Sequence, residues 1–218
     1  MKSFSNGYQP GIFSYSKECD DLINILKLNN NKKIIKWQIL NSRNVQNLIL
    51  NLVGFTPTTK KELKEAIDLW CNNKEKAKIK YGEINTWNVH NITDMSNLFK
   101  DYKCFNDNIN NWNVSKVTTM EGMFSNCHKF NKSLNNWNVS NVNNMKCMFK
   151  MCHIFNQTLN NWDVSKVIDM NCMFYSCLVF NQPLNNWNVS NVTDMSLIFN
   201  NCWHFNQQLN NLKSFYIY

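Results

Sequence analysis

The chain has 218 residues, a hydrophobic fraction of 44% and a formal net charge of +8, values that fit one large or two small folded domains. Asparagine occupies 42 positions, whereas glycine and proline number only 5 and 3, which excludes collagen-like and Gly/Pro-rich disordered chains. No window approaches 18 consecutive apolar residues, which excludes an ordinary membrane-spanning helix.

Residues 1–56 predict a helical N-terminal segment whose role the sequence leaves open. Its two apolar runs, CDDLINILKL and VQNLILNLVGF, either extend the cap predicted at residues 57–83 or form a separate small domain. The start, MKSFSNGYQPGIF, has no apolar stretch after its lysine, so we expect no secretory signal and an intracellular location. In such a reducing location, most of the nine cysteines are expected to be free thiols.

Positive charge is concentrated in residues 1–83, where 14 Lys and Arg residues face 8 Asp and Glu residues. The densest basic stretch, NKEKAKIKYG at 73–82, carries no interleaved aromatic platform and matches no nucleic-acid-binding motif. We therefore interpret it as a solvated helix face, and we expect neither nucleic-acid nor membrane binding.

Residues 57–83 predict a helical cap. In TKKELKEAIDLW, Thr59 and Glu62 have the spacing of a capping box. Four apolar residues lie beyond them on one helical face: Leu63, Ala66, Ile67 and Trp70. Such a helix is expected to cover the open end of the first repeat, as stacked-repeat proteins require at their ends.

Residues 84–218 contain five copies of a 25-residue repeat, and their last residues predict a short C-terminal strand. Tryptophan recurs every 25 residues, and one methionine and two phenylalanine columns keep the same step. The tryptophans of this column are Trp87, Trp112, Trp137, Trp162 and Trp187. A fixed period of this length predicts units that bury their apolar faces by stacking on their neighbours.

Each repeat predicts a short strand followed by a short helix. In LNNWNVS, Trp137 and Val139 alternate with polar residues, as on a strand that is buried on one face. The apolar residues after it recur at intervals of three or four, as in one or two helical turns. These residues are Val142, Met145, Met148, Phe149 and Cys152. A threonine, aspartate or asparagine precedes the methionine in every copy, which predicts a helix N-cap.

One asparagine column has two possible roles. It consists of Asn106, Asn131, Asn156, Asn181 and Asn206, each of which comes directly after a phenylalanine. These side chains either form a buried ladder that bonds loop backbone groups of adjacent coils or lie in solvent-facing turns. We favour the ladder.

The cysteines and histidines predict no chemical site. The C-x4-C pairs that Cys147 and Cys172 make with later cysteines place the thiols on different faces of a helix, so we expect buried free thiols rather than zinc ligands or stacked disulfides. We also find no Cys–His nucleophile arrangement and no glycine-rich phosphate loop. We therefore expect a non-enzymatic chain without catalytic residues, metal or cofactor. The main cysteine column is Cys127, Cys152, Cys177 and Cys202.

The pattern L-x-x-W-x-V, together with M-x-x-(M/L/I)-F-x-x-C-x-x-F-N after it, resembles the BspA-like leucine-rich repeat family over about residues 57–212. The resemblance implies an α/β fold: a right-handed leucine-rich-repeat solenoid with a parallel β-sheet on its concave side, short helices on its convex side and an N-terminal helical cap. Described members are mostly surface proteins or lipoproteins that bind other proteins. Similar asparagine-rich, unexported versions occur in large DNA viruses and protists, and a viral chain would lie in the host cell.

The outward residues of the expected strands are the candidate binding surface, because amides offer both donors and acceptors. They form two polar columns on the concave face: Thr86, Asn111, Asn136, Asn161 and Asn186, and Asn88, Asn113, Asn138, Asp163 and Asn188. We expect a protein-interaction module with an unknown protein partner. The alternative is a passive structural or assembly protein that self-associates through its open C-terminal end, where Phe215 and Ile217 predict an uncovered strand.

Overall fold

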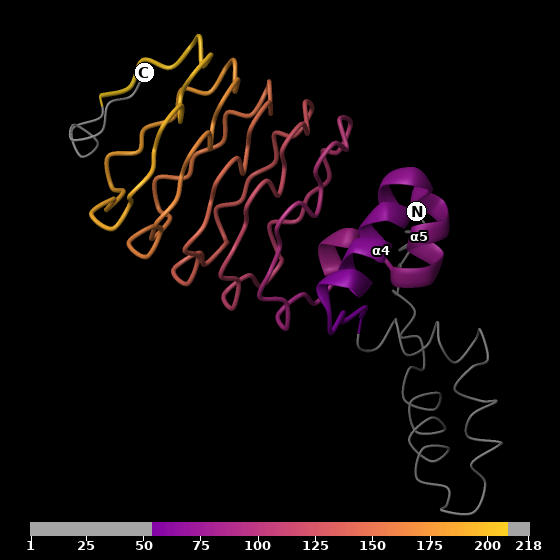
Figure 1. Ribbon diagram of the computed structural model, residues 1–218. Coiled ribbons are helices and arrows are strands. Elements are labelled where there is room, and N and C mark those ends of the chain that lie inside the picture. The colour runs from indigo at the N-terminus through magenta and orange to yellow at the C-terminus, as the bar shows by residue number, and fades with distance from the viewer. Residues whose placement is uncertain (1–53, 209–218) are drawn as a thin grey trace, which may run out of the picture. The chain divides into compact units, whose positions relative to one another are not determined.

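The computed structural model of the chain describes residues 54–208 (Figure 1). These residues all belong to one compact unit, Asn47–Tyr218. Three short elements come first: α4 (Lys60–Asn72), α5 (Lys74–Tyr81) and the 3-10 helix η1 (Ile84–Thr86). A row of 25-residue coils begins at η1, and we number the coils 1 to 5 for residues 84–108, 109–133, 134–158, 159–183 and 184–208.

Two predictions from the sequence fall on residues outside the described range. They are the role of the N-terminal segment, of which residues 1–53 lie outside that range, and the C-terminal strand with its open edge. Among residues 54–208, no helix is long and apolar enough to cross a membrane.

Helix α4 begins where the sequence predicts. Thr59 is its N-cap, and the Thr59 hydroxyl accepts a hydrogen bond from the Glu62 amide at 3.2 Å. The Glu62 carboxylate accepts from the Thr58 amide rather than from Thr59, so the reciprocal bond of a capping box is shifted by one residue. The predicted apolar face is buried as expected, with Leu63, Ala66, Ile67 and Trp70 inside.

The two helices close the first coil. The Trp87 ring of coil 1 meets Trp70 edge-on, with ring centroids 5.8 Å apart, and Phe55 and Tyr81 also pack against it. Lys60 at the start of α4 reaches the Asp94 carboxylate at 3.0 Å. The first coil therefore has a buried tryptophan where an uncovered coil would expose one.

The fold class expected from the resemblance is wrong. Within residues 54–208 there is no β-strand and hence no sheet, and the β-type pairing between adjacent coils is limited to isolated parallel bridges. These bridges are Asp94↔Thr119, Thr119↔Asn144, Asn144↔Asp169 and Asp169↔Asp194. A leucine-rich-repeat solenoid with a parallel sheet on one side and helices on the other is therefore not the architecture of this part of the chain.

The segment predicted as a strand consists of tight turns. The Trp137 amide donates to the Leu134 carbonyl at 3.1 Å, and the Val142 amide donates to Val139 at 2.8 Å. Between these turns, Asn138 accepts from the Ser140 amide through its side chain. Asparagine side chains compete in this way for backbone donors that a sheet would use, and the segment bends instead of extending.

The segment predicted as a helix carries the backbone hydrogen bonds between coils. The Cys147 amide donates to Asn171 at 2.8 Å and the Phe149 amide donates to Met173 at 2.9 Å, both in the next coil. Cys147 and Met151 have positive φ angles of 53° and 60°, which an α-helix does not contain. Successive turns, and not a helix, thus bury the apolar residues that lie three or four positions apart. We call this run of bonds, which joins residues 93–101 to their equivalents in the later coils, the backbone ladder.

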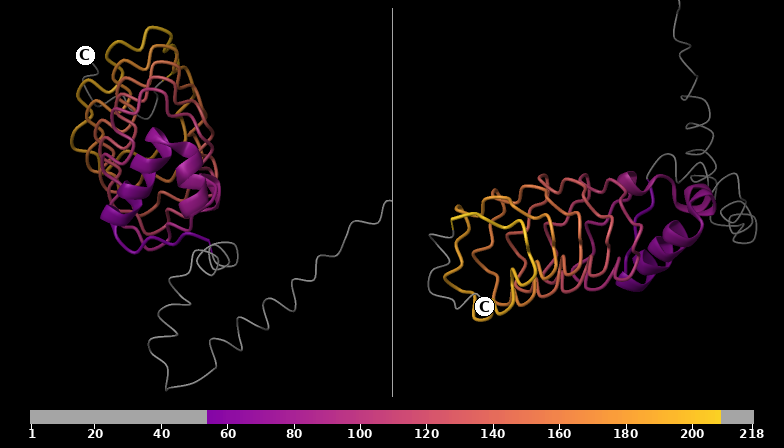
Figure 2. Two further views of the ribbon diagram at one scale, coloured as in Figure 1. Left: turned by 90° about the vertical axis from the view of Figure 1, so that its right-hand side faces the viewer. Right: turned by 90° about the horizontal axis from the view of Figure 1, so that it is seen from above.

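The core consists of aromatic columns that run through all the coils, as the sequence predicts. Phe149 is fully buried and stacks between Phe124 and Phe174, with ring centroids 5.7 Å from each. Trp137 stacks on Trp162 at 6.5 Å. In the left view of Figure 2, which looks along the row, the coils lie one behind another.

The tryptophan and cysteine columns also join neighbouring coils through hydrogen bonds of their side chains. Each buried tryptophan from coil 2 onward donates through Nε1 to a carbonyl of the preceding coil, as Trp137 does to Ile109 at 3.1 Å. The thiol of Cys152 donates to the Phe124 carbonyl at 3.1 Å in the same manner. These repeated bonds fix the offset between coils, because a shift of one residue would break them in every coil at once.

The predicted asparagine ladder is confirmed. Each side-chain oxygen of this column accepts a hydrogen bond from the backbone amide of the equivalent asparagine in the next coil, at 2.9 Å in all four steps from Asn106 to Asn206. In three steps a glutamine also donates to the asparagine side chain, as Gln182 does to Asn156 at 3.0 Å. The column is half-buried up to Asn181.

Candidate functional site

All ten residues predicted to bind a partner are exposed, although none of them lies on a strand. In the column that begins at Asn88, each side-chain oxygen accepts the backbone amide of the residue two positions later, as Asn113 does from Ser115 at 3.1 Å. Hydrogen bonds from the Ser165 side chain and amide lower the pKa of Asp163. The oxygens of this column therefore serve the local turn before they can serve a partner.

The second predicted column is crossed by links between coils. The amides of Asn136 and Asn186 each donate to an asparagine side chain of the preceding coil, Asn110 and Asn160, at 3.0 Å. These bonds hold the backbone behind the exposed side chains. The face is uniform along the row because nearly the same residue recurs in every coil.

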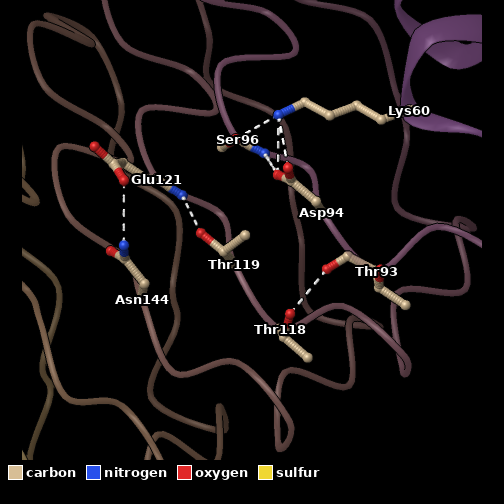
Figure 3. Close-up of polar contacts among 8 residues, drawn as sticks. All are labelled: Lys60, Thr93, Asp94, Ser96, Thr118, Thr119, Glu121 and Asn144. Atoms are coloured by element: carbon tan, nitrogen blue, oxygen red, sulfur yellow. Dashed lines mark hydrogen bonds and ion pairs between the residues drawn. The ribbon is translucent and has the colours of Figure 1, made fainter.

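A second polar surface lies along the start of the backbone ladder, and we call it the ladder face (Figure 3). Each coil contributes two residues to it, the bridge residue and the residue two positions later. The pairs are Asp94 with Ser96, Thr119 with Glu121, Asn144 with Lys146, Asp169 with Asn171, and Asp194 with Ser196.

The bridge residue of each pair has one structural task. Its side-chain oxygen accepts the amide of the second residue, at 2.7 Å for Asp94, 3.4 Å for Thr119 and 2.9 Å for Asn144. The same bond is 2.8 Å long at Asp169 and at Asp194. The sequence predicts this use of short oxygen-bearing side chains, but it assigns them to helix N-caps, whereas the structure places them in turns.

The second residue of each pair varies in charge and size. Serine, glutamate, lysine, asparagine and serine succeed one another at this position from coil 1 to coil 5. Glu121 accepts a bond from the Asn144 side chain at 3.2 Å, and the Asn171 side chain bonds the Ser196 hydroxyl at 2.6 Å. The ladder face therefore combines a constant backbone with a changing set of donors, acceptors and charges.

The α4 end of the ladder face is held by an ion pair. Lys60 bonds both oxygens of Asp94 and also contacts the Ser96 hydroxyl. Desolvation alone would raise the pKa of Asp94, but hydrogen bonds from Ser96 and Lys60 outweigh it and hold that pKa below its usual value. Asp94 therefore presents a charged group whose lone pairs are largely used.

A half-open pocket of about 400 Å³ lies between the end of α4 and the 101–107 loop of coil 1. Trp70 Nε1 and the Lys74 ammonium both donate to Asp107, at 2.9 and 2.5 Å, and Tyr102 donates to Asp68 at 2.7 Å. Burial raises the pKa of Cys71, which also lines the pocket, to about 12. Trp70, Lys74 and Asp107 are thus paired with one another, and the half-buried thiol of Cys71 is protonated at neutral pH.

The main cysteine column is unsuited to nucleophilic chemistry. Its thiols are free and donate to backbone carbonyls. Burial raises the pKa of Cys202 to about 12 and raises that of Cys152 and Cys177 well above the ordinary value. In the part of the chain that the structure describes, no three His, Cys, Asp or Glu residues are grouped so as to hold a metal ion.

His128 and His153 stack across coils 2 and 3, with ring centroids 4.4 Å apart. Desolvation lowers the pKa of His128, and the neighbouring His153, Lys103 and Lys129 lower it further.

This lowered pKa predicts a loss of stability in mild acid. A histidine whose folded-state pKa lies below its unfolded value of about 6.5 binds more protons when unfolded. Its contribution is therefore fully present above about pH 6.5 and is lost as the pH falls through the lower, folded-state pKa. Urea denaturation from pH 7.5 to pH 5 should show the free energy of unfolding falling, and His128→Gln should show a shallower fall. An unchanged slope in the variant would exclude His128 as the cause.

Sequence reasoning missed the second residues of the ladder face. The signal that identifies them is a contrast within the chain: the columns at Trp137 and Asn156 repeat almost without change, whereas the column at Lys146 differs between neighbouring coils. The difference between the constant columns and the variable column at Lys146 is overlooked when the residues around Lys146 are assigned to a helix.

Comparison with known proteins identifies the family of the chain. The family model described as "Mycoplasma protein of unknown function, DUF285" matches residues 68–177 and 137–214, which together span more than half of the 218 residues. No curated protein and no solved structure matches the chain. The chain therefore belongs to the DUF285 family.

Proposed function

We propose that the chain is a non-enzymatic protein-interaction module whose main contact surface is the ladder face. The observation that carries the proposal is the variation of side chains at positions 96, 121, 146, 171 and 196 on a backbone that is the same in each coil. A surface that discriminates between partners needs such differences, because a uniform surface offers the same contacts in every register.

The hydrogen bonds of the repeated columns support this assignment by elimination. The Asn156 oxygen has two donors in the next coil and the Asn138 oxygen has one in its own turn. By contrast, no hydrogen bond or ion pair of the Lys146 ammonium is found with any residue from 54 to 208. Lys146 and the carboxylate of Glu121 lie on adjacent coils and offer opposite charges to a partner. Complementary charge on a partner would increase its association rate and fix its register.

The exposed asparagine columns, from Thr86 to Asn188, are proposed as a secondary contact surface. The side-chain nitrogens of the asparagines in these columns are donors that the local turns do not use. The resemblance to the BspA-like family, whose described members mostly bind other proteins, also supports an interaction role. We further propose that the chain acts inside a cell.

Site-specific photocrosslinking tests the proposal. A benzophenone amino acid is placed at Lys146 on the ladder face and, as a matched control in the same coil, at Asn138 on the asparagine face. We expect ultraviolet irradiation in cells that express the chain to yield a discrete crosslinked protein from position 146 and a much weaker product, or none, from position 138.

The charge variant Glu121→Lys, made in the chain that carries the crosslinker at position 146, completes this test. It is expected to reduce the crosslinked product at least fivefold, with the circular dichroism and melting temperature of the chain unchanged. Crosslinks that are equal from the two faces, or that join only copies of the chain, would contradict the ladder face as the partner site.

A further inference from the structure

Two cysteines of neighbouring coils occupy the same position of the backbone ladder. Cys147 in coil 3 and Cys172 in coil 4 have φ angles of 53° and 55°. The Cys147 amide donates to the carbonyl of Asn171, the residue before Cys172, at 2.8 Å. The ladder therefore fixes the two residues side by side. Cysteine rarely adopts this left-handed conformation. The residues at the same position of coils 2 and 1, Gly122 and Asn97, are types that adopt it more readily.

Side chains at this position reach the neighbouring coil. A Cβ added at Gly122 would lie 2.5 Å from Oδ1 and 3.4 Å from Cγ of Asn97 in the preceding coil. Because Cys147 and Cys172 have the same backbone conformation and register, the Cys147 thiol is directed toward Cys172. Burial raises the pKa of Cys147, and the neighbouring Cys172 raises it further, in part through a hydrogen bond between the two side chains.

We propose that Cys147 and Cys172 form a two-coordinate site for Cu(I), which bridges coils 3 and 4. A metal–thiolate bond is about 2.3 Å long, so a linear two-coordinate ion spans about twice that length, close to the spacing of about 4.8 Å between hydrogen-bonded neighbouring backbones. Paired thiolates select soft cations such as Cu(I). Zinc would need four ligands, and the described residues offer no group of three.

Charge and protons balance when Cu(I) binds this pair. Cu(I) displaces one proton from each thiol and forms two metal–sulfur bonds, so the product is a bis-thiolate complex of net charge −1 and two released protons. Lys150 and Lys146 lie close enough to favour the Cys147 thiolate, and they would offset the negative complex. Cys172 is buried and Cys147 is half-buried, so the ion has a path from solvent on the Cys147 side.

Cu(I) titration of the reduced full-length chain, in competition with a coloured Cu(I) chelator, tests the site. We expect the native chain and Cys104→Ser, which removes an exposed thiol, to hold one equivalent tightly. Cys147→Gly and Cys172→Ser should each lose at least tenfold in affinity for that equivalent. Glycine suits the positive φ of position 147 and keeps that variant folded.

A second measurement separates this site from adventitious binding to other thiols. Cu(I) should raise the melting temperature of the native chain and of Cys104→Ser, because a bridge between coils stabilises only the folded state. It should leave the melting temperature of Cys147→Gly unchanged. Equal copper affinity in the native chain and in Cys147→Gly, or loss of the tight equivalent in Cys104→Ser, would overturn the proposal.

Discussion

Replacement of Phe149 by alanine is expected to lower the free energy of unfolding by about 3–5 kcal/mol. The ring lies at the centre of the row, is fully buried, and stacks on Phe124, Phe174 and Phe155 with centroid distances of 5.7, 5.7 and 4.2 Å. Its removal leaves a cavity that the neighbouring rings cannot fill, because the backbone ladder holds the coils at their spacing. Urea denaturation monitored by tryptophan fluorescence measures the change.

Ile154→Ala in the same coil is the matched control. Ile154 is 39% exposed, so its truncation removes less buried surface and should cost under about 1 kcal/mol. Similar losses in both variants would mean that the stacked phenylalanine column does not form the core of coil 3.

Asn156→Ala is expected to cost about 1–3 kcal/mol. The Asn156 oxygen accepts from the Asn181 amide at 2.9 Å and from the Gln182 side chain at 3.0 Å. Alanine leaves a half-buried backbone amide without this acceptor, and the desolvation of that amide is then uncompensated. The change is again measured as the free energy of unfolding in urea.

Two comparisons make the ladder effect specific. Asn136→Ala removes an exposed side chain of the same type and should change stability by less than about 0.5 kcal/mol. Asn156→Asp keeps the acceptor oxygen and should recover at least half of the loss seen in Asn156→Ala at pH 7. If Asn156→Ala is no more harmful than Asn136→Ala, the asparagine column does not join the coils.

The period and the core could be predicted from the sequence because they depend on which side chains avoid water. The 25-residue step places Trp137, Phe149 and Phe155 in columns, and each is buried as its column requires. The asparagine ladder was predictable for a related reason. A polar residue that recurs beside a buried phenylalanine needs a hydrogen-bond partner, and the equivalent residue of the next coil is the nearest one.

The local conformation could not be predicted, because spacing alone does not determine backbone angles. Met145, Met148 and Phe149 have the spacing of a helical face, but successive turns with positive φ at Cys147 and Met151 give the same burial pattern. The alternation of Trp137 and Val139 with asparagines indicated a strand, but the Asn138 side chain accepts the Ser140 amide and closes a turn. Helix and strand were therefore assigned to segments that contain neither.

The candidate site was predictable only in its exposure. Asn111 and Asn138 are exposed as expected. The hydrogen bond from the Ser140 amide to the Asn138 side chain was not predicted, because it depends on the backbone angles of the turn. The ladder face was missed because Glu121 and Lys146 were assigned to a helix on the far side of a sheet. Variation between copies of one repeat would have identified them.

The most direct test of this architecture is the detection of scalar couplings through hydrogen bonds in the isotope-labelled chain. The backbone ladder predicts couplings from the Cys147 amide nitrogen to the Asn171 carbonyl carbon and from the Phe149 nitrogen to the Met173 carbonyl carbon. Couplings from Cys147 to the Asn143 carbonyl, four residues back, would instead show a helix. They would contradict the stacked turns from which the ladder face and the Cys147–Cys172 pair are derived.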